Sequence, residues 1–235
     1  MKRLFLLLIS SYFLYASSEF VKIETAFSTF FIGKYEVTKK EFKEFVNDTQ
    51  YITDAQKNMG NIKGCFTYID KEWKYRDGYN WKNTGYKQTD IDPVVCVSYN
   101  DIQAYIQWLN KKTNEMYRLP TSKEWQYIAK ANTTTKWSFG DDEKELKNYA
   151  WYNKNSDYKT HPIGQKKPNI FGIYDLYGNV YEWTEDLNDL KDTKLLHGGC
   201  LWTDIYWTNS TANFKLEKFK RSSGAGFRLV KEKKE

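Results

Sequence analysis

The stretch Pro168–Asp186, which reads PNIFGIYDLYGNVYEWTED, constrains the fold more than any other part of the chain. It combines glycines, which permit backbone conformations that other residues resist, with oxygen-bearing side chains and large aromatic residues. Two interpretations fit this composition. The stretch is either an oxygen-rich loop for a hard cation such as calcium, or a turn whose aromatic side chains fill a core. The residues alone leave both open.

The rest of the composition indicates a globular chain with a large core. Aromatic residues make up 18% of the 235 positions, which is enough to bury a substantial interior and argues against disorder. One domain accounts for this length. The net charge is +6, but the lysines are scattered and form no basic stripe, so we expect no nucleic-acid partner.

The first eighteen residues have the pattern of a signal peptide. Lys2 and Arg3 precede the apolar run Leu4–Tyr15, and the small residues Ala16–Ser18 provide a cleavage site. The run is short for a membrane span, although a retained anchor is the alternative. We therefore expect an exported mature protein, residues 19–235, that is periplasmic or secreted and has no stable membrane span after cleavage. Disulfides are permitted in such a compartment.

The cysteines and histidines limit the possible metal chemistry. The chain has three cysteines, so one disulfide and one free thiol are possible, but spacing alone does not choose the pair. His161 and His197 are the two histidines. Neither a CxxC motif nor Cys/His ligand spacing is present, which argues against a zinc site.

Three helix starts are the clearest local signals. Capping boxes begin at Thr38, Ser98 and Thr121, each with an acidic residue three positions later and an apolar face behind it. Pro93–Val97 has the pattern of a buried strand, and Tyr51–Pro93 that of a long ordered loop with aromatic anchors and short strands. Few short helices, many short strands and long loops predict a single α+β domain.

Several short motifs occur in an order that resembles the formylglycine-generating enzyme (sulfatase-modifying factor) family. The motifs are YEVT at 35–38, PVVCVSYND at 93–101, YRLPT at 117–121, FGIYD at 171–175, GNVYEW at 178–183, the glycine pair 198–199 and GFR at 226–228. The resemblance covers residues 19–235. It implies a C-type-lectin-like variant of the formylglycine-generating enzyme fold, with calcium as structural support.

The resemblance also identifies what this chain lacks. Enzymes of the family oxidise a substrate cysteine to formylglycine, using two cysteines near the C-terminus that hold copper(I). The corresponding positions here carry Thr203 and Thr208. A shifted alignment would place Cys200 on the first of them and leave the second without a thiol. The chain is therefore expected to bind no copper and to have no catalytic cysteine pair. Cys200, with His197 as the nearest imidazole in sequence, is a weak candidate nucleophile.

Two further sets of residues follow from the resemblance. The family's second calcium loop implies Asp175 and Glu182 as side-chain ligands, with the backbone oxygens of Gly178 and Val180. Relatives with a Gly-Cys pair and a Cys in the Pro-Val-Val segment imply a Cys65–Cys96 disulfide. The alternative for Cys96 is a small buried apolar residue.

Two functions remain in view. The first is a binding or accessory scaffold that presents its aromatic loop region, Leu201–Lys220, to another exported or envelope protein, or to a glycan. The alternative is an oxidoreductase of the same family with different chemistry, in oxidative protein or metabolite maturation. An iron site with three histidines is excluded, because the chain has two.

Overall fold

The computed structural model describes residues 19–25, 28–57, 62–187 and 192–233. The predicted signal peptide, residues 1–18, lies outside them. Within the described part, none of the helices has the length and apolar character that a membrane crossing requires.

The three predicted capping boxes are all present and begin the three longest α-helices. These are α1 (Lys39–Thr49), α3 (Tyr99–Thr113) and α4 (Ser122–Lys130). At each start the Ser or Thr side chain accepts a backbone N–H, and the acidic residue three positions later accepts the N–H of the cap itself. The sequence did not predict α2 (Asp54–Lys57) or the short 3-10 helix η1 (Glu143–Asn148).

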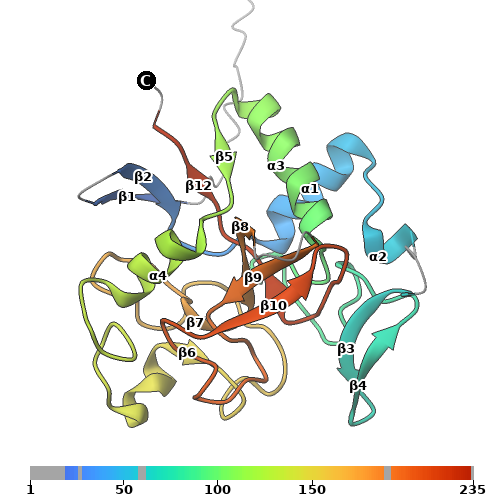
Figure 1. Cartoon of the computed structure of the whole chain (residues 1–235). Helices are drawn as coiled ribbons and strands as arrows, with labels where there is room; N and C mark the ends of the chain where they lie inside the picture. The colour runs from blue at the N-terminus through green and yellow to red at the C-terminus, as the bar shows by residue number, and fades with distance from the viewer. Residues whose placement is uncertain (1–18, 26–27, 58–61, 188–191, 234–235) are drawn as a thin grey trace, which may run out of the picture.

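The strands form two four-stranded sheets and two short pairs (Figure 1). The first sheet has the order β1-β2-β12-β5, with bounds Phe20–Glu24, Thr29–Gly33, Val230–Lys231 and Tyr117–Arg118. The second has the order β10-β9-β8-β11, with bounds Asn213–Glu217, Thr193–His197, Tyr181–Leu187 and Ala225–Gly226. The pairs are the antiparallel hairpin β3 (Cys65–Ile69) and β4 (Glu72–Arg76), and the parallel pair β6 (Ala150–Trp151) and β7 (Tyr177–Gly178).

The core supports both sheets with aromatic side chains. Phe42 and Phe45 of α1 pack against Tyr105 of α3, with ring centroids 5.7–5.8 Å apart. A second cluster surrounds Trp125 of α4 and the buried Trp137. In Figure 1, α1 and α3 lie together, and the β3–β4 hairpin stands beside β10. Many short strands and few helices give the mixed α+β architecture that the sequence predicted.

The Cys65–Cys96 disulfide is present, as the resemblance implied, with Cα atoms 5.5 Å apart. It ties the start of β3 to the segment 93–97. That segment is buried as predicted, but it is no strand of either sheet: Pro93 forms an isolated bridge with Thr38, and Cys96 has a φ of 61°. The N–H of Val94 donates to the carbonyl oxygen of Val37, and the N–H of Cys96 donates to that of Ser222. These are single bonds to two different segments, not the repeated hydrogen bonds of a strand pair. The prediction of a regular strand here was wrong for that reason.

Candidate functional site

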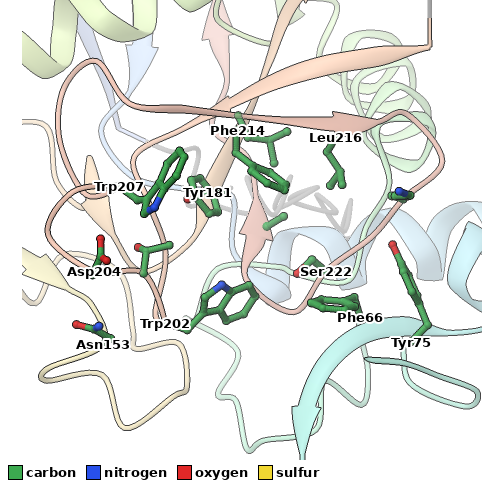
Figure 2. A pocket seen from close by; sticks show the side chains of 14 residues that line it. Phe66, Tyr75, Asn153, Tyr181, Trp202, Asp204, Trp207, Phe214, Leu216 and Ser222 are labelled. Carbon is green, nitrogen blue, oxygen red and sulfur yellow. The ribbon is translucent and has the colours of Figure 1, made fainter. Parts of the chain in front are cut away.

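An aromatic cleft of about 540 Å³ lies between the second sheet and the β3–β4 hairpin (Figure 2). Its size falls in the range of ligand-binding pockets. Six aromatic residues dominate the lining and only a few polar groups interrupt it. The aromatic cleft is lined by Phe66, Tyr75, Asn153, Tyr181, Leu196, Trp202, Thr203, Asp204, Trp207, Phe214, Leu216, Lys220, Ser222 and Ala225.

The sheet provides one wall through the two-residue repeat of its strands. Phe214 and Leu216 are separated by one residue on β10 and therefore point to the same face. Phe214 stacks on Tyr181 of β8 with ring centroids 5.7 Å apart. This wall is partly open to solvent, because Phe214 is 44% exposed and the nearby Trp207 is 48% exposed.

The hairpin provides the opposite wall. Phe66 and Tyr75 are cross-strand partners, and Trp73 of β4 contacts Trp202 with ring centroids 4.2 Å apart. The buried Arg221 anchors the segment before the hairpin, because its guanidinium donates to the carbonyl oxygens of Gly64 at 2.6 Å and Ile62 at 2.7 Å. Together with the disulfide, these bonds give the cleft a fixed wall.

Thr203 and Thr208 converge next to the cleft. Their Oγ1 atoms lie 3.0 Å apart, both residues are buried, and Thr203 is part of the cleft lining. Gly199, with φ of +75°, makes this possible: a Cβ there would lie 2.8 Å from each of the two hydroxyl oxygens. The positions that the resemblance assigns to the catalytic cysteines are therefore side by side, but they carry neutral hydroxyls, which are poor ligands for copper(I).

Cys200 has the surroundings of a structural thiol. It is fully buried, and burial raises the pKa of the thiol well above its usual range, so that the nucleophilic thiolate is disfavoured. His197 has other partners: Nε2 lies 2.7 Å from Ser122 Oγ, Nδ1 lies 3.1 Å from the Ala212 carbonyl oxygen, and the ring stacks on Trp125. These contacts argue against a Cys200–His197 nucleophile pair.

The two predicted calcium side chains belong to a buried charged cluster, which we call the carboxylate cluster: Glu36, Asp175, Glu182 and Arg228. Glu182 accepts two hydrogen bonds from Arg228 and one from Trp125 Nε1, each 2.6 Å long. Asp175 Oδ2 accepts the N–H of Gly164 at 2.6 Å, whereas Oδ1 is buried and has no hydrogen-bond partner. Glu36 is similar: Oε2 accepts from Asn179 at 2.9 Å and Oε1 has none.

The cluster is electrostatically unbalanced when all of its groups are ionised, with three carboxylates against one guanidinium. Burial raises the pKa of Asp175 to about 6, and burial together with the neighbouring Asp175 raises the pKa of Glu36 well above its ordinary value. Glu36 was not among the predicted site residues. It is remote in sequence from the other three residues, and only the YEVT motif marked it.

The residues fit calcium in part. A divalent cation would balance the excess negative charge, and the unpartnered Asp175 Oδ1 could serve as one of its ligands. Glu182, in contrast, already has Arg228 and Trp125 as partners, and the described residues contain no group of three or more His, Cys, Asp or Glu placed to hold a metal. The predicted calcium site has only two carboxylates, from Asp175 and Glu182, and its other ligands are the backbone carbonyls of Gly178 and Val180. The absence of a three-residue group therefore does not test it. Calcium at Asp175, Gly178, Val180 and Glu182 therefore stays a prediction.

Sequence comparison places the chain near one enzyme family. A model of the sulfatase-modifying factor enzyme 1-like domain matches residues 12–233. The formylglycine-generating enzyme of Mycobacterium tuberculosis is 30% identical over 194 residues, which cover 66% of this chain and 62% of that protein. The inactive C-alpha-formylglycine-generating enzyme 2 of Bos taurus is 27% identical over 214 residues, covering 77% and 68%. The chaperone protein LppX of Paenibacillus barcinonensis is 29% identical over 198 residues, covering 71% and 65%.

Solved structures share the fold over nearly the whole chain. PvdO from Pseudomonas aeruginosa superposes with a TM-score of 0.73 at 25% identity, covering 88% of this chain and 81% of that one. Treponema denticola variable protein 1 gives a TM-score of 0.67 at 24% identity, covering 88% and 85%. The architecture is thus the C-type-lectin-like variant that the resemblance implied. The chain spans less than two thirds of the mycobacterial enzyme's length.

Proposed function

Because the chain belongs to the formylglycine-generating enzyme (sulfatase-modifying factor) family, we propose that it is a member without the family's oxidase chemistry, acting as a binding or accessory scaffold. The Thr203–Thr208 pair carries this proposal. The two hydroxyls lie 3.0 Å apart next to the cleft, so the scaffold brings these positions together without the thiols that copper(I) requires. Relatives named as inactive and as a chaperone are consistent with such a role.

The aromatic cleft is the surface that would bind the partner. Large aromatic residues contribute most of the binding energy of many protein interfaces, particularly on a preorganised surface. Here Trp207 and Phe214 are partly exposed, and the hairpin wall behind them is fixed by the disulfide and by Arg221. We take the partner to be another exported or envelope protein, with a glycan as the alternative.

The proposed location is outside the cytoplasm, either periplasmic or secreted. The buried disulfide supports an oxidising compartment, and the pattern of residues 1–18 supports export. Calcium, in this proposal, is structural. Bound at Asp175 and Glu182 it would supply positive charge to the carboxylate cluster, away from the cleft lining.

The second candidate is an oxidoreductase of the same family with different chemistry, which the overall likeness to PvdO keeps in view. Its difficulty is the shortage of redox ligands. The one unpaired cysteine of the described residues is buried Cys200, and both histidine rings have hydrogen-bond partners. Metal analysis of the purified mature protein separates the two. Copper or iron bound at one ion per protein molecule would favour the oxidoreductase. Loss of copper uptake in Cys200→Ser would assign the copper to that thiol.

Site-specific photo-crosslinking in the source organism tests the scaffold. A photo-reactive amino acid at Trp207, on the cleft lining, should give a discrete adduct with one partner. The adduct should disappear when Phe214→Asp is added, because a charge replaces an apolar contact. The matched control is the same amino acid at Ile170, which is 71% exposed and lies outside the cleft lining. Identical adducts from both positions, or formylglycine formation on a cysteine peptide by the copper-loaded protein, would contradict the proposal.

A further inference from the structure

One end of the aromatic cleft collects hydrogen-bond acceptors. Asp204 and Asn153 lie close together there in Figure 2. The Asp204 carboxylate is exposed, Oδ1 accepts the N–H of Tyr206 at 2.9 Å, and no Lys or Arg of the described residues forms a salt bridge with it. Asn153 Oδ1 is buried and has no hydrogen-bond partner. A ligand that places donors or positive charge here would pair with the exposed Asp204 carboxylate.

The aromatic rings beside these acceptors favour the same charge. Trp207 and Tyr181 lie next to Asp204 in Figure 2, and Phe214 stacks on Tyr181. The faces of such rings attract cations, most strongly for Trp. Lys220, the one Lys or Arg of the cleft lining, has its positive charge paired with Glu217 at 2.8 Å. The cleft is therefore polarised, with its unpaired negative charge at the Trp207 end.

We propose that the Asp204 end of the cleft is an ammonium subsite, which takes a lysine side chain from an extended segment of the partner protein. This inference rests on the proposed scaffold function and specifies what its cleft recognises. The lysine N–H groups would donate to the exposed carboxylate of Asp204, beside Asn153 on the cleft lining. The aliphatic stem would lie along Phe214 and Leu216, so that apolar area is buried while the charge stays near the rim.

The arrangement of β10 favours a polypeptide as the source of the ammonium group. Among the described strands, β10 has only β9 as a hydrogen-bonded neighbour, so it is an edge strand. An extended segment that pairs with this edge would direct alternate side chains to the face that carries Phe214 and Leu216. One side chain of the segment would then reach the cleft.

Other ligand chemistries fit less well. An anionic group would be repelled by Asp204. A sugar could not use the hydroxyl of Thr203, which is already bonded to Thr208 and to the backbone of Cys200. The lining thus offers an acceptor end and an apolar stem channel, which match an alkylammonium group.

Matched peptides test the subsite on the full chain. The probes are a blocked five-residue peptide with a central lysine, and the same peptide with norleucine, which keeps the stem and removes the charge. Isothermal titration calorimetry can follow binding without relying on any of the nine tryptophans of the chain. We expect the lysine peptide to bind at least about fivefold more tightly than the norleucine peptide. Equal affinity of the two peptides would overturn the proposal.

Variants of the acceptor end make the test specific. D204N keeps the side-chain oxygen that accepts the Tyr206 N–H, and should weaken lysine-peptide binding about three- to tenfold while leaving norleucine-peptide binding unchanged. W207L should also reduce the preference for lysine. The matched control D157N removes an exposed carboxylate outside the cleft lining and should change neither affinity. An unchanged lysine preference in D204N would overturn the subsite.

Two further outcomes separate this inference from the proposed function. If n-butylamine binds as tightly as the lysine peptide, the polypeptide source is wrong. If the Trp207 crosslink forms with a partner but D204N leaves that adduct and the peptide preference intact, the scaffold function stands and the ammonium subsite fails. Absence of any cleft-dependent adduct would instead contradict the scaffold function itself.

Discussion

The aromatic cleft and the carboxylate cluster are built in opposite ways. In the cluster, Arg228 and Glu182 are fully buried, and Arg228 also donates to the carbonyl oxygens of Gly33 at 3.0 Å and Tyr174 at 2.9 Å. In the cleft, aromatic rings stay partly exposed, and two hydroxyls occupy the positions that the resemblance assigns to the catalytic cysteines. The buried cluster thus stabilises the fold through paired charges, whereas the cleft leaves apolar surface open to a ligand.

The largest expected effect would restore the missing ligands. The double substitution Thr203→Cys/Thr208→Cys should raise affinity for copper(I) at least about a hundredfold, because two facing thiolates suit this soft ion and hydroxyls do not. An anaerobic titration against a copper(I) chelator would measure the change. The matched control is Thr211→Cys/Ser210→Cys, which adds two thiols outside the pair. Equal copper uptake by both variants would mean that the cleft geometry contributes nothing.

Breaking the carboxylate cluster should cost the most stability. Arg228→Met leaves Glu182 buried without its ion-pair partner, so the free energy of unfolding should fall by about 3–5 kcal/mol in urea denaturation. Lys22→Met breaks the exposed pair with Glu24 and is the control, for which we expect no measurable change in stability. If the free energy of unfolding fell by a similar amount in the two variants, the buried ion pair would contribute no more to stability than the exposed one.

Removing the disulfide should destabilise the wall of the cleft by a comparable but smaller amount. Cys65 and Cys96 are 31 positions apart, and the chain-entropy model gives about 3–4 kcal/mol for such a loop. We expect this loss for Cys65→Ala/Cys96→Ala in denaturant unfolding, and weaker binding at the cleft. Cys200→Ala is the control for losing a buried sulfur outside a disulfide. A double variant that unfolds like wild type would contradict the expectation.

The smallest predicted effect concerns pH and calcium. The pKa of Asp175 is raised to about 6 by burial, so in chelator its contribution to stability is fully present below the unfolded pKa of about 4 and is lost as pH rises through about 6. Calcium at pH 7 should reverse this loss, raising the melting temperature of wild type but not of Asp175→Asn. Asp101, whose pKa is also about 6, remains in both proteins and so cancels in the comparison. Glu36 does not cancel, because removing the Asp175 charge lowers the pKa of Glu36, and its titration must be followed in both proteins.

Calcium-induced stabilisation that persists in Asp175→Asn would remove calcium from this cluster. A double Asp175→Ala/Glu182→Ala variant is less informative than the single one. Loss of Glu182 also leaves the buried Arg228 guanidinium without its ion-pair partner. This would lower the melting temperature whether or not calcium is present.

Local signals were readable from the sequence, whereas long-range partners were not. The capping boxes at Thr38, Ser98 and Thr121 predicted helices because both halves of each box lie within four residues. The strand β10 was missed: the sequence analysis placed it within the aromatic loop region Leu201–Lys220, and it becomes a strand only through pairing with β9. The hydrophobic period and the strand propensity of one segment carry no information about which distant segment will pair with it.

The same limit applied to the candidate site. The order of the family motifs placed Thr203 and Thr208, and it implied the Cys65–Cys96 disulfide. Single-segment reasoning did not reveal that Glu36 joins Asp175 and Glu182, or that Arg228 holds Glu182. Nor did it show that the hairpin residues Phe66 and Tyr75 face β10 across a cleft, since that wall depends on contacts between distant segments.

The disulfide-anchored hairpin has a consequence for when the protein can act. In a reducing cytoplasm Cys65 and Cys96 would remain thiols, and the hairpin wall would lack its covalent tether. If the chain is exported as proposed, the cleft reaches its final shape only after oxidation, in the compartment where an exported partner is present. Oxidation would then act as a licensing step, so that newly made chains do not engage partners before both have left the cytoplasm.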